Sequence, residues 1–133
     1  MKKLFNLSFF YVILGLALGV FYREFTKFNG FTGKTTLAAA HTHTLVLGFI
    51  FLLIVLLLDK SFNLSANKHF TKWLLVYNIG VISLIGTIVA RGILEVLGSD
   101  FAGLSHIAGT GHAILGISLI WFMLILKKEA FKK

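Results

Sequence analysis

Five ionisable side chains in apolar segments are the residues best suited to chemistry. They are His41, His43, Arg91, His106 and His112. Ionisable groups are costly inside a lipid bilayer, so their presence in apolar segments points to a function. Imidazole nitrogens bind haem iron, copper and zinc. The residue types therefore predict a ligand site built from histidines, with an arginine available to pair with an anionic group.

Rotation about a helix limits which of these histidines can share a ligand. His41 and His43 differ by about 200° around a regular helix, so they face different ways. His106 and His112 differ by about 120° and lie ~9 Å apart along the axis. A compact zinc cage of all four is therefore not expected. A site with one histidine from each of two helices is easier to build, so either member of the first pair is expected to act with either member of the second.

The composition places these histidines in a membrane protein. Of the 133 residues, 57% are hydrophobic and 14% are charged, a balance typical of integral membrane chains. The apolar runs predict an all-α fold, an integral membrane four-helix bundle in a single domain (residues 1–133) that has the lipid bilayer as its surroundings. The expected spans are about 4–22, 37–58, 73–96 and 103–126, each long enough for a hydrocarbon core of ~30 Å. Polar stretches at 23–36 and 59–71 are expected to be loops.

The first apolar run begins as a signal peptide would, after Lys2 and Lys3. It ends without a small-residue cleavage site, so we expect a retained transmembrane helix. Gly15 and Gly19 in this run have the spacing that lets two helices approach closely.

Basic residues between the spans predict the orientation. Nine of them lie at the N-terminus, the second loop and the C-terminus: Lys2, Lys3, Lys60, Lys68, Lys72, Lys127, Lys128, Lys132 and Lys133. Four lie on the other side: Arg23, Lys27, Lys34 and Arg91. Because cytoplasmic loops carry the excess of Lys and Arg, both termini are expected in the cytoplasm. In this orientation the four histidines of the spans and the arginine occupy one outer layer, about 5 to 13 Å deep by the helical rise.

Charge and cysteine usage exclude other classes. The formal net charge is +8, but the basic residues form no stripe, so nucleic acid is not an expected partner. The chain has no cysteine and therefore no disulfide, no thiolate ligand and no Cys-x-x-Cys-His motif for covalent haem attachment. We find no phosphate loop, no Ser-His-Asp arrangement and no dinucleotide fingerprint.

Small residues around His112 favour a flat ligand. Ala108, Gly109 and Gly116 lie on the same helical face as this histidine. A haem needs axial imidazoles on opposite sides of its ring, apolar walls and, commonly, a cation near its propionates. Phenylalanines and leucines would supply the walls, and Arg91 the cation. We therefore expect a non-covalent, b-type haem near the outer face, serving one-electron transfer, or haem or gas sensing if one axial position is open.

Two other classes of protein explain the same residues. The histidines could organise helix contacts in a non-catalytic structural membrane protein. They could also belong to a protein that binds or transports a divalent metal, copper or zinc. The sequence specifies no substrate and no redox partner.

Residues His41-Thr42-His43-Thr44-Leu45-Val46-Leu47-Gly48-Phe49 resemble the start of the histidine-bearing second helix of the haem-copper oxidase catalytic subunit, including its nitric oxide reductase branch. The resemblance implies that His41 or His43 is an axial ligand of a low-spin haem. The chain has far fewer spans than those subunits and lacks their adjacent His-His pair and His-Tyr motif. We therefore expect an electron-transfer or binding protein rather than a complete oxidase.

Taken whole, the chain is similar to a family of short, uncharacterised four-helix membrane proteins from bacteria. This resemblance implies the bacterial cytoplasmic membrane as the location. Because four spans resemble one arc of the larger oxidase subunit, a homo-oligomer that completes a haem pocket between subunits is a further hypothesis.

Overall fold

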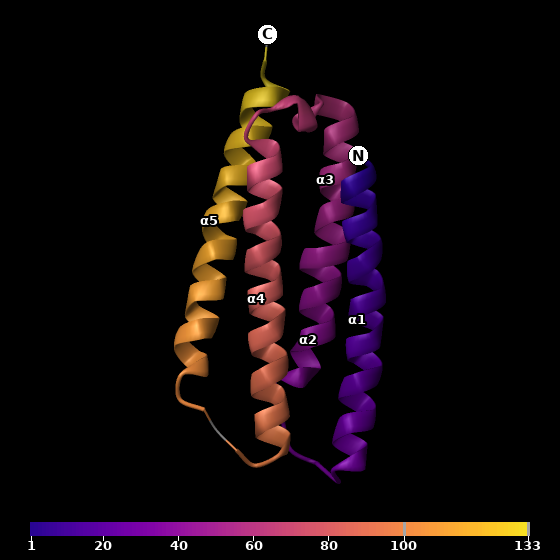
Figure 1. Cartoon of the computed structure of the whole chain (residues 1–133). Helices are drawn as coiled ribbons and strands as arrows, with labels where there is room; N and C mark the ends of the chain where they lie inside the picture. Colours follow the sequence, from indigo (N-terminus) through magenta and orange to yellow (C-terminus); the bar gives the residue numbers. More distant parts are fainter. Residues whose placement is uncertain (100, 133) are drawn as a thin grey trace.

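The computed structural model describes residues 1–99 and 101–132 and consists of long helices packed side by side (Figure 1). The helices in chain order are α1 (Lys2–Phe28), α2 (Leu37–His43), η1 (Thr44–Ile50), α3 (Phe51–Phe62), η2 (Leu64–Ala66), α4 (Phe70–Val96) and α5 (Leu104–Ala130). Because α2, η1 and α3 follow one another without a break, they make one span, Leu37–Phe62. The fold is therefore an all-α bundle of four spans, with the chain ends at the same end of the bundle.

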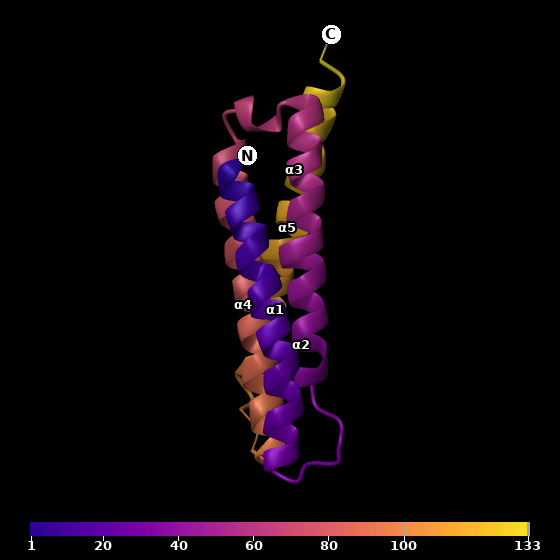
Figure 2. The same ribbon diagram turned by 90° about the vertical axis from the view of Figure 1, so that its right-hand side faces the viewer.

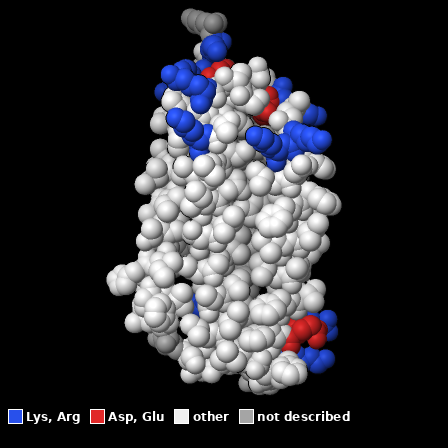
Figure 3. All heavy atoms as spheres, in the orientation of Figure 1, with Lys and Arg blue, Asp and Glu red and all other residues white. Residues whose placement is uncertain are grey.

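The four spans are long and apolar enough to cross a membrane, at 26 or 27 residues each. A helix of that length extends ~40 Å, more than the ~30 Å of a hydrocarbon core. Figure 3 shows the Lys, Arg, Asp and Glu side chains gathered toward the two ends of the molecule, with a broad uncharged belt between them. These features make the chain a multi-pass membrane protein.

Neighbouring spans in the sequence are also neighbours in space. The span Leu37–Phe62 packs on α1 and on α4, and α4 packs extensively along α5. Seen from the side, α1 and α4 lie in one layer, and the second span and α5 lie in the other (Figure 2). The second span therefore faces α5 across the bundle and packs on it through α3, near the end of the bundle that carries the chain termini.

Four helix ends extend three or more residues beyond the sequence-based expectation, among them the end of α5, which continues to Ala130 beyond residue 126. α1 continues to Phe28, inside the predicted loop 23–36, and α3 continues to Phe62 beyond the expected end near residue 58. α4 begins at Phe70 instead of residue 73, and η2 forms a short helical turn within the predicted loop 59–71. Hydropathy marks the part of a helix that lies in lipid, whereas polar residues continue the helix past that border. The predicted loops were therefore too long.

Close packing of α1 on the second span depends on one of its two glycines. A Cβ built at Gly15 would meet the Leu45 side chain at 2.7 Å, whereas one at Gly19 would make an ordinary van der Waals contact with His41, at 3.8 Å. Gly15 therefore lets α1 approach the second span, while Gly19 faces His41 without such a constraint.

An aromatic cluster fills the centre of the bundle on the side of the chain termini. Trp73 is fully buried, stacks near Phe122 at a centroid distance of 4.8 Å, and donates its indole N–H to the Ser118 carbonyl at 2.8 Å. Tyr77 is also fully buried and lies 4.9 Å from the Phe51 ring. Because a buried indole or phenol needs a hydrogen-bond partner, these contacts fix α4 against its neighbours.

Candidate ligand site between the second span and α5

A cleft of about 390 Å³ opens between the second span and α5, and we call it the histidine cleft. Its lining residues are Thr42, His43, Val46, Leu47, Leu84, His112 and Leu115. The first four belong to α2 and η1, the last two belong to α5, and Leu84 of α4 forms the floor. It exists because α5 packs along α4 and leaves α2 and η1 without a partner on this side. Its volume lies within the range of small-molecule sites, ~300–1,000 Å³.

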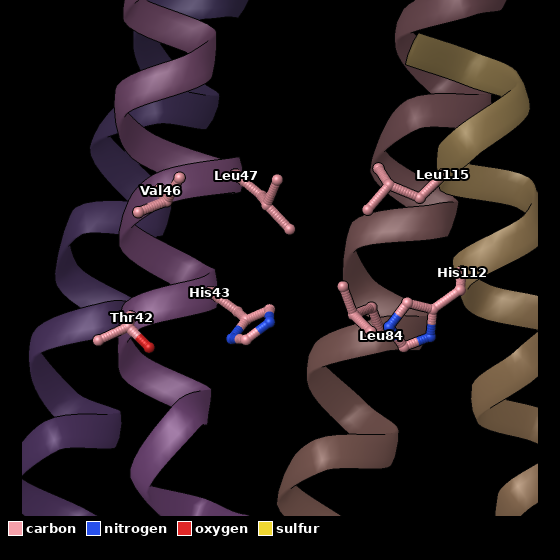
Figure 4. A pocket seen from close by; sticks show the side chains of 7 residues that line it. All are labelled: Thr42, His43, Val46, Leu47, Leu84, His112 and Leu115. Carbon is pink, nitrogen blue, oxygen red and sulfur yellow. The ribbon is translucent and has the colours of Figure 1, made fainter. Parts of the chain in front are cut away.

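His43 and His112 enter the cleft from opposite walls. Figure 4 shows the two imidazole rings pointing toward one another from the second span and from α5. His43 is half-buried, and His112 is exposed along the open side of the cleft. Of the four candidate histidines, this is the pair that the cleft brings together, one from each of two helices.

Each of the two rings makes the same kind of hydrogen bond to the backbone of its own helix. The Nδ1 atom of His43 lies 2.8 Å from the Ala39 carbonyl oxygen, and the Nδ1 atom of His112 lies 2.8 Å from the Ala108 carbonyl oxygen. A carbonyl oxygen only accepts, so each Nδ1 carries the proton and donates it. The Nε2 atom of each neutral ring then keeps its lone pair for a ligand. Metal-binding histidines commonly donate from one ring nitrogen in this way, which fixes the orientation of the ring.

The remaining walls of the cleft are mostly aliphatic. Val46, Leu47, Leu84 and Leu115 supply them, and the residues of the described chain that line the cleft include no Asp, Glu, Lys or Arg. Phenylalanine, expected in these walls from the sequence, is not among the lining residues. Such walls suit an apolar ligand.

His41 and His106 lie elsewhere. His41 faces α1 at Gly19, and its Nδ1 atom is buried without a hydrogen-bond partner among the described residues. His106 is exposed in the first turn of α5, six residues (~9 Å of helical rise) before His112. In the part of the chain that the structure describes, no three His, Cys, Asp or Glu residues gather into a metal-binding group.

Arg91 lines a second cavity, of about 240 Å³, with Leu94, Glu95, Ser99 and Leu104. Its Nε atom lies 3.8 Å from the Glu95 carboxylate, and the arginine side chain is 47% exposed. Asp100, the other acidic partner considered from the sequence, lies outside the described residues. Arg91 and Leu84 are seven residues apart in α4, which places them on the same helical face about 10 Å apart along the axis. The arginine is therefore beyond the histidine cleft, toward the α5 start.

Sequence reasoning missed most of the cleft lining. Val46 and Leu47 follow His43 by three and four residues, so helical spacing alone would place them beside it. Leu84 and Leu115 carry no such signal, because their position depends on how α4 and α5 pack against the second span.

The fold and the cleft define a small multi-pass membrane protein with a histidine-flanked apolar site between two helices. A family model described as "Protein of unknown function (DUF2871)" matches residues 1–129, so the chain belongs to that family. Neither the curated proteins nor the solved structures give a match. The family match agrees with the expected small, uncharacterised helical family, whereas the resemblance to haem-copper oxidases stays a prediction.

Proposed function

We propose that this protein binds a b-type haem in the histidine cleft, with His43 and His112 as axial ligands, and that it serves one-electron transfer in the bacterial cytoplasmic membrane. The observation that carries the proposal is the pair of imidazoles on opposite walls, each with Nδ1 bonded to a carbonyl. Haem binding uses two such nitrogens on opposite sides of a plane. A structural zinc site uses four ligands, and a catalytic one three.

The chain's own residues prepare this site in three ways. The Ala39 and Ala108 carbonyls hold the rings in one tautomer and make Nε2 more basic. The aliphatic walls exclude water, which tunes the reduction potential of a bound metal centre. Arg91 lies two turns from Leu84 on the same face of α4, beyond the cleft toward the start of α5, and we assign to it the pairing with the negatively charged haem propionates. The haem itself supplies the one-electron chemistry.

An absorption spectrum tests the proposal. Detergent-purified protein is titrated with haemin, and spectra are recorded before and after dithionite reduction. We expect a saturable Soret band and resolved reduced α and β bands, the signature of six-coordinate haem. The His43→Ala and His112→Ala variants are expected to lose it, and the His41→Ala and His106→Ala variants are matched controls that keep it. A spectrum with one axial position open would indicate gas or haem sensing instead of electron transfer.

The competing classes are separated by the same preparation. A folded protein that stays colourless after haemin addition rejects haem binding. Copper or zinc found by metal analysis in that colourless protein would then identify a divalent-metal protein, whereas its absence would leave a structural role for the histidines.

A further inference from the structure

The helix widens directly after His43. Residues Thr44–Ile50 form the π-helical segment η1, with α2 before it and α3 after it. Buried residues of this span recur at every fourth position, namely Ala40, Thr44, Gly48 and Leu52. Three intervals of four residues overshoot a regular α-helix by about 120°, so a regular helix would spread these four residues over a third of its circumference. A π turn spans one more residue, and η1 thereby keeps the buried faces of α2 and α3 in line.

Two side chains from other helices hold this wide turn. The Tyr77 hydroxyl of α4 donates to the Leu47 carbonyl at 2.7 Å, and the Ser8 hydroxyl of α1 donates to the Phe49 carbonyl at 3.1 Å. Both acceptors belong to η1, where the Phe51 N–H bonds the Val46 carbonyl, five residues back, instead of the Leu47 carbonyl four residues back. An unsatisfied backbone group costs several kcal/mol within a bilayer, so the Tyr77 bond to Leu47 favours this arrangement, and the Ser8 bond adds a second contact from α1.

We propose that Tyr77 and Ser8 are positioning residues that maintain η1 and thereby aim His43 at His112. If η1 became a regular helix while α3 stayed packed through Leu52 and Val55, α2 would turn by about 100°, the rotation of one residue. His43 would then leave the cleft. The aim of the side chain is a property of the ligand-free chain, and only its consequence for haem ligation rests on the proposed function.

The absence of native cysteine makes a direct test possible. The double variant His43→Cys/His112→Cys is purified without ligand and treated with a short bifunctional thiol reagent, and the intramolecular cross-link is quantified by mass spectrometry. We expect efficient cross-linking in this parent and a several-fold lower yield after Tyr77→Phe or Ser8→Ala. Tyr11→Phe is the matched control, because this buried tyrosine hydroxyl donates to Asn78, 2.8 Å away, and not to η1.

Deletion of one residue of η1 should reverse the effect of Tyr77→Phe on cross-linking. Val46 lies in η1 and is 53% exposed, so its removal takes out one residue with little loss of packing. The shortened segment suits a regular helix with the same buried faces. We therefore expect the deletion to restore cross-linking in the Tyr77→Phe background, an effect that general destabilisation cannot produce.

The outcomes decide the inference. A parent that does not cross-link, or Tyr77→Phe and Ser8→Ala variants that both match the Tyr11→Phe control, would overturn it. Failure of the Val46 deletion to restore the yield would overturn it too. If Tyr77→Phe aggregates, Ser8→Ala alone decides, and the deletion is then tested in that background. A chain that cross-links as expected but does not bind haemin rejects the proposed function and keeps the role of η1. A chain that binds haemin, but whose Tyr77→Phe and Ser8→Ala variants cross-link as well as the parent, keeps the proposed function and rejects the role of η1.

Discussion

The orientation and tautomer of each cleft histidine are set by a hydrogen bond within its own helix. Each ring donates from Nδ1 to the carbonyl of the residue four positions earlier, Ala39 for His43 and Ala108 for His112. This bond fixes the tautomer without any carboxylate partner. It also directs Nε2 away from the helix that carries the ring.

Gly48 of η1 lets the segment pack closely against α1. A Cβ at Gly48 would overlap the Tyr11 ring, so Gly48→Ala is expected to lower the free energy of unfolding in detergent by about 1–3 kcal/mol. Gly86→Ala is the matched control, because nothing lies within 4 Å of a Cβ at that position. The control is expected to be neutral or to gain up to about 1 kcal/mol from helix propensity. Equal effects of the two substitutions would show that the close approach does not matter.

At the scale of elements, the start of α2 is attached to the end of α4. The Glu95 carboxylate accepts hydrogen bonds from the Thr36 backbone N–H at 2.7 Å and from the Thr36 hydroxyl at 3.1 Å. Thr35 adds a bond from its hydroxyl to the Gly92 carbonyl at 2.9 Å. A carboxylate at a helix N-terminus also interacts favourably with the helix dipole. This junction sets the height of α2, and so of His43, relative to α4.

Removing that carboxylate should loosen the start of α2. We expect Glu95→Ala to cost about 1–2 kcal/mol of unfolding free energy, since bonds to a charged group are lost and the Thr36 N–H is left without its partner. Hydrogen exchange should rise in residues 36–40. Glu24→Ala is the control, because its side chain is 58% exposed and, among the described residues, pairs with the exposed Arg23 side chain. Unchanged exchange in Glu95→Ala would contradict the junction.

The four spans could be predicted from the sequence, because runs of apolar residues report directly on lipid contact. The helix ends could not, since Arg23 and Lys27 continue α1 outside the apolar run. The π turn was also out of reach when a regular helix was assumed. The four-residue spacing of Ala40, Thr44, Gly48 and Leu52 is visible in the sequence, but only the structure shows that all are buried.

The candidate site, too, could be predicted only in part from the sequence. Helical rotation predicted that His41 and His43 face different ways, and the structure directs the former toward α1 and the latter into the cleft. The choice between His106 and His112 required the packing of α5 on α4. The residues that face a histidine across the bundle depend on how two helices pack, and the sequence around the histidine does not show that packing.

For the whole molecule, the two ends of the bundle differ in charge. Both chain ends lie at one end with the connection between α3 and α4, and that end carries most of the lysines (Figures 1 and 3). The positive-inside rule predicts that this end faces the cytoplasm, which would place the histidine cleft in the outer half of the membrane.

Cysteine labelling tests this orientation. In intact cells, a membrane-impermeant maleimide is expected to label a Lys34→Cys variant, whose connection lies at the other end of the bundle. A Lys68→Cys variant should be labelled only after the cells are permeabilised. The native chain has no cysteine and serves as the blank. The reverse pattern would place both termini outside and the cleft in the inner half.

Restoring a deleted ligand with free imidazole tests the haem proposal most directly. The His43→Gly and His112→Gly variants are reconstituted with haemin, and their reduced spectra are recorded with and without added imidazole. We predict that each variant loses the six-coordinate spectrum and regains it with imidazole, whereas His106→Gly keeps it throughout. Wild-type spectra from both cleft variants without imidazole would contradict the assignment of His43 and His112 as the ligands.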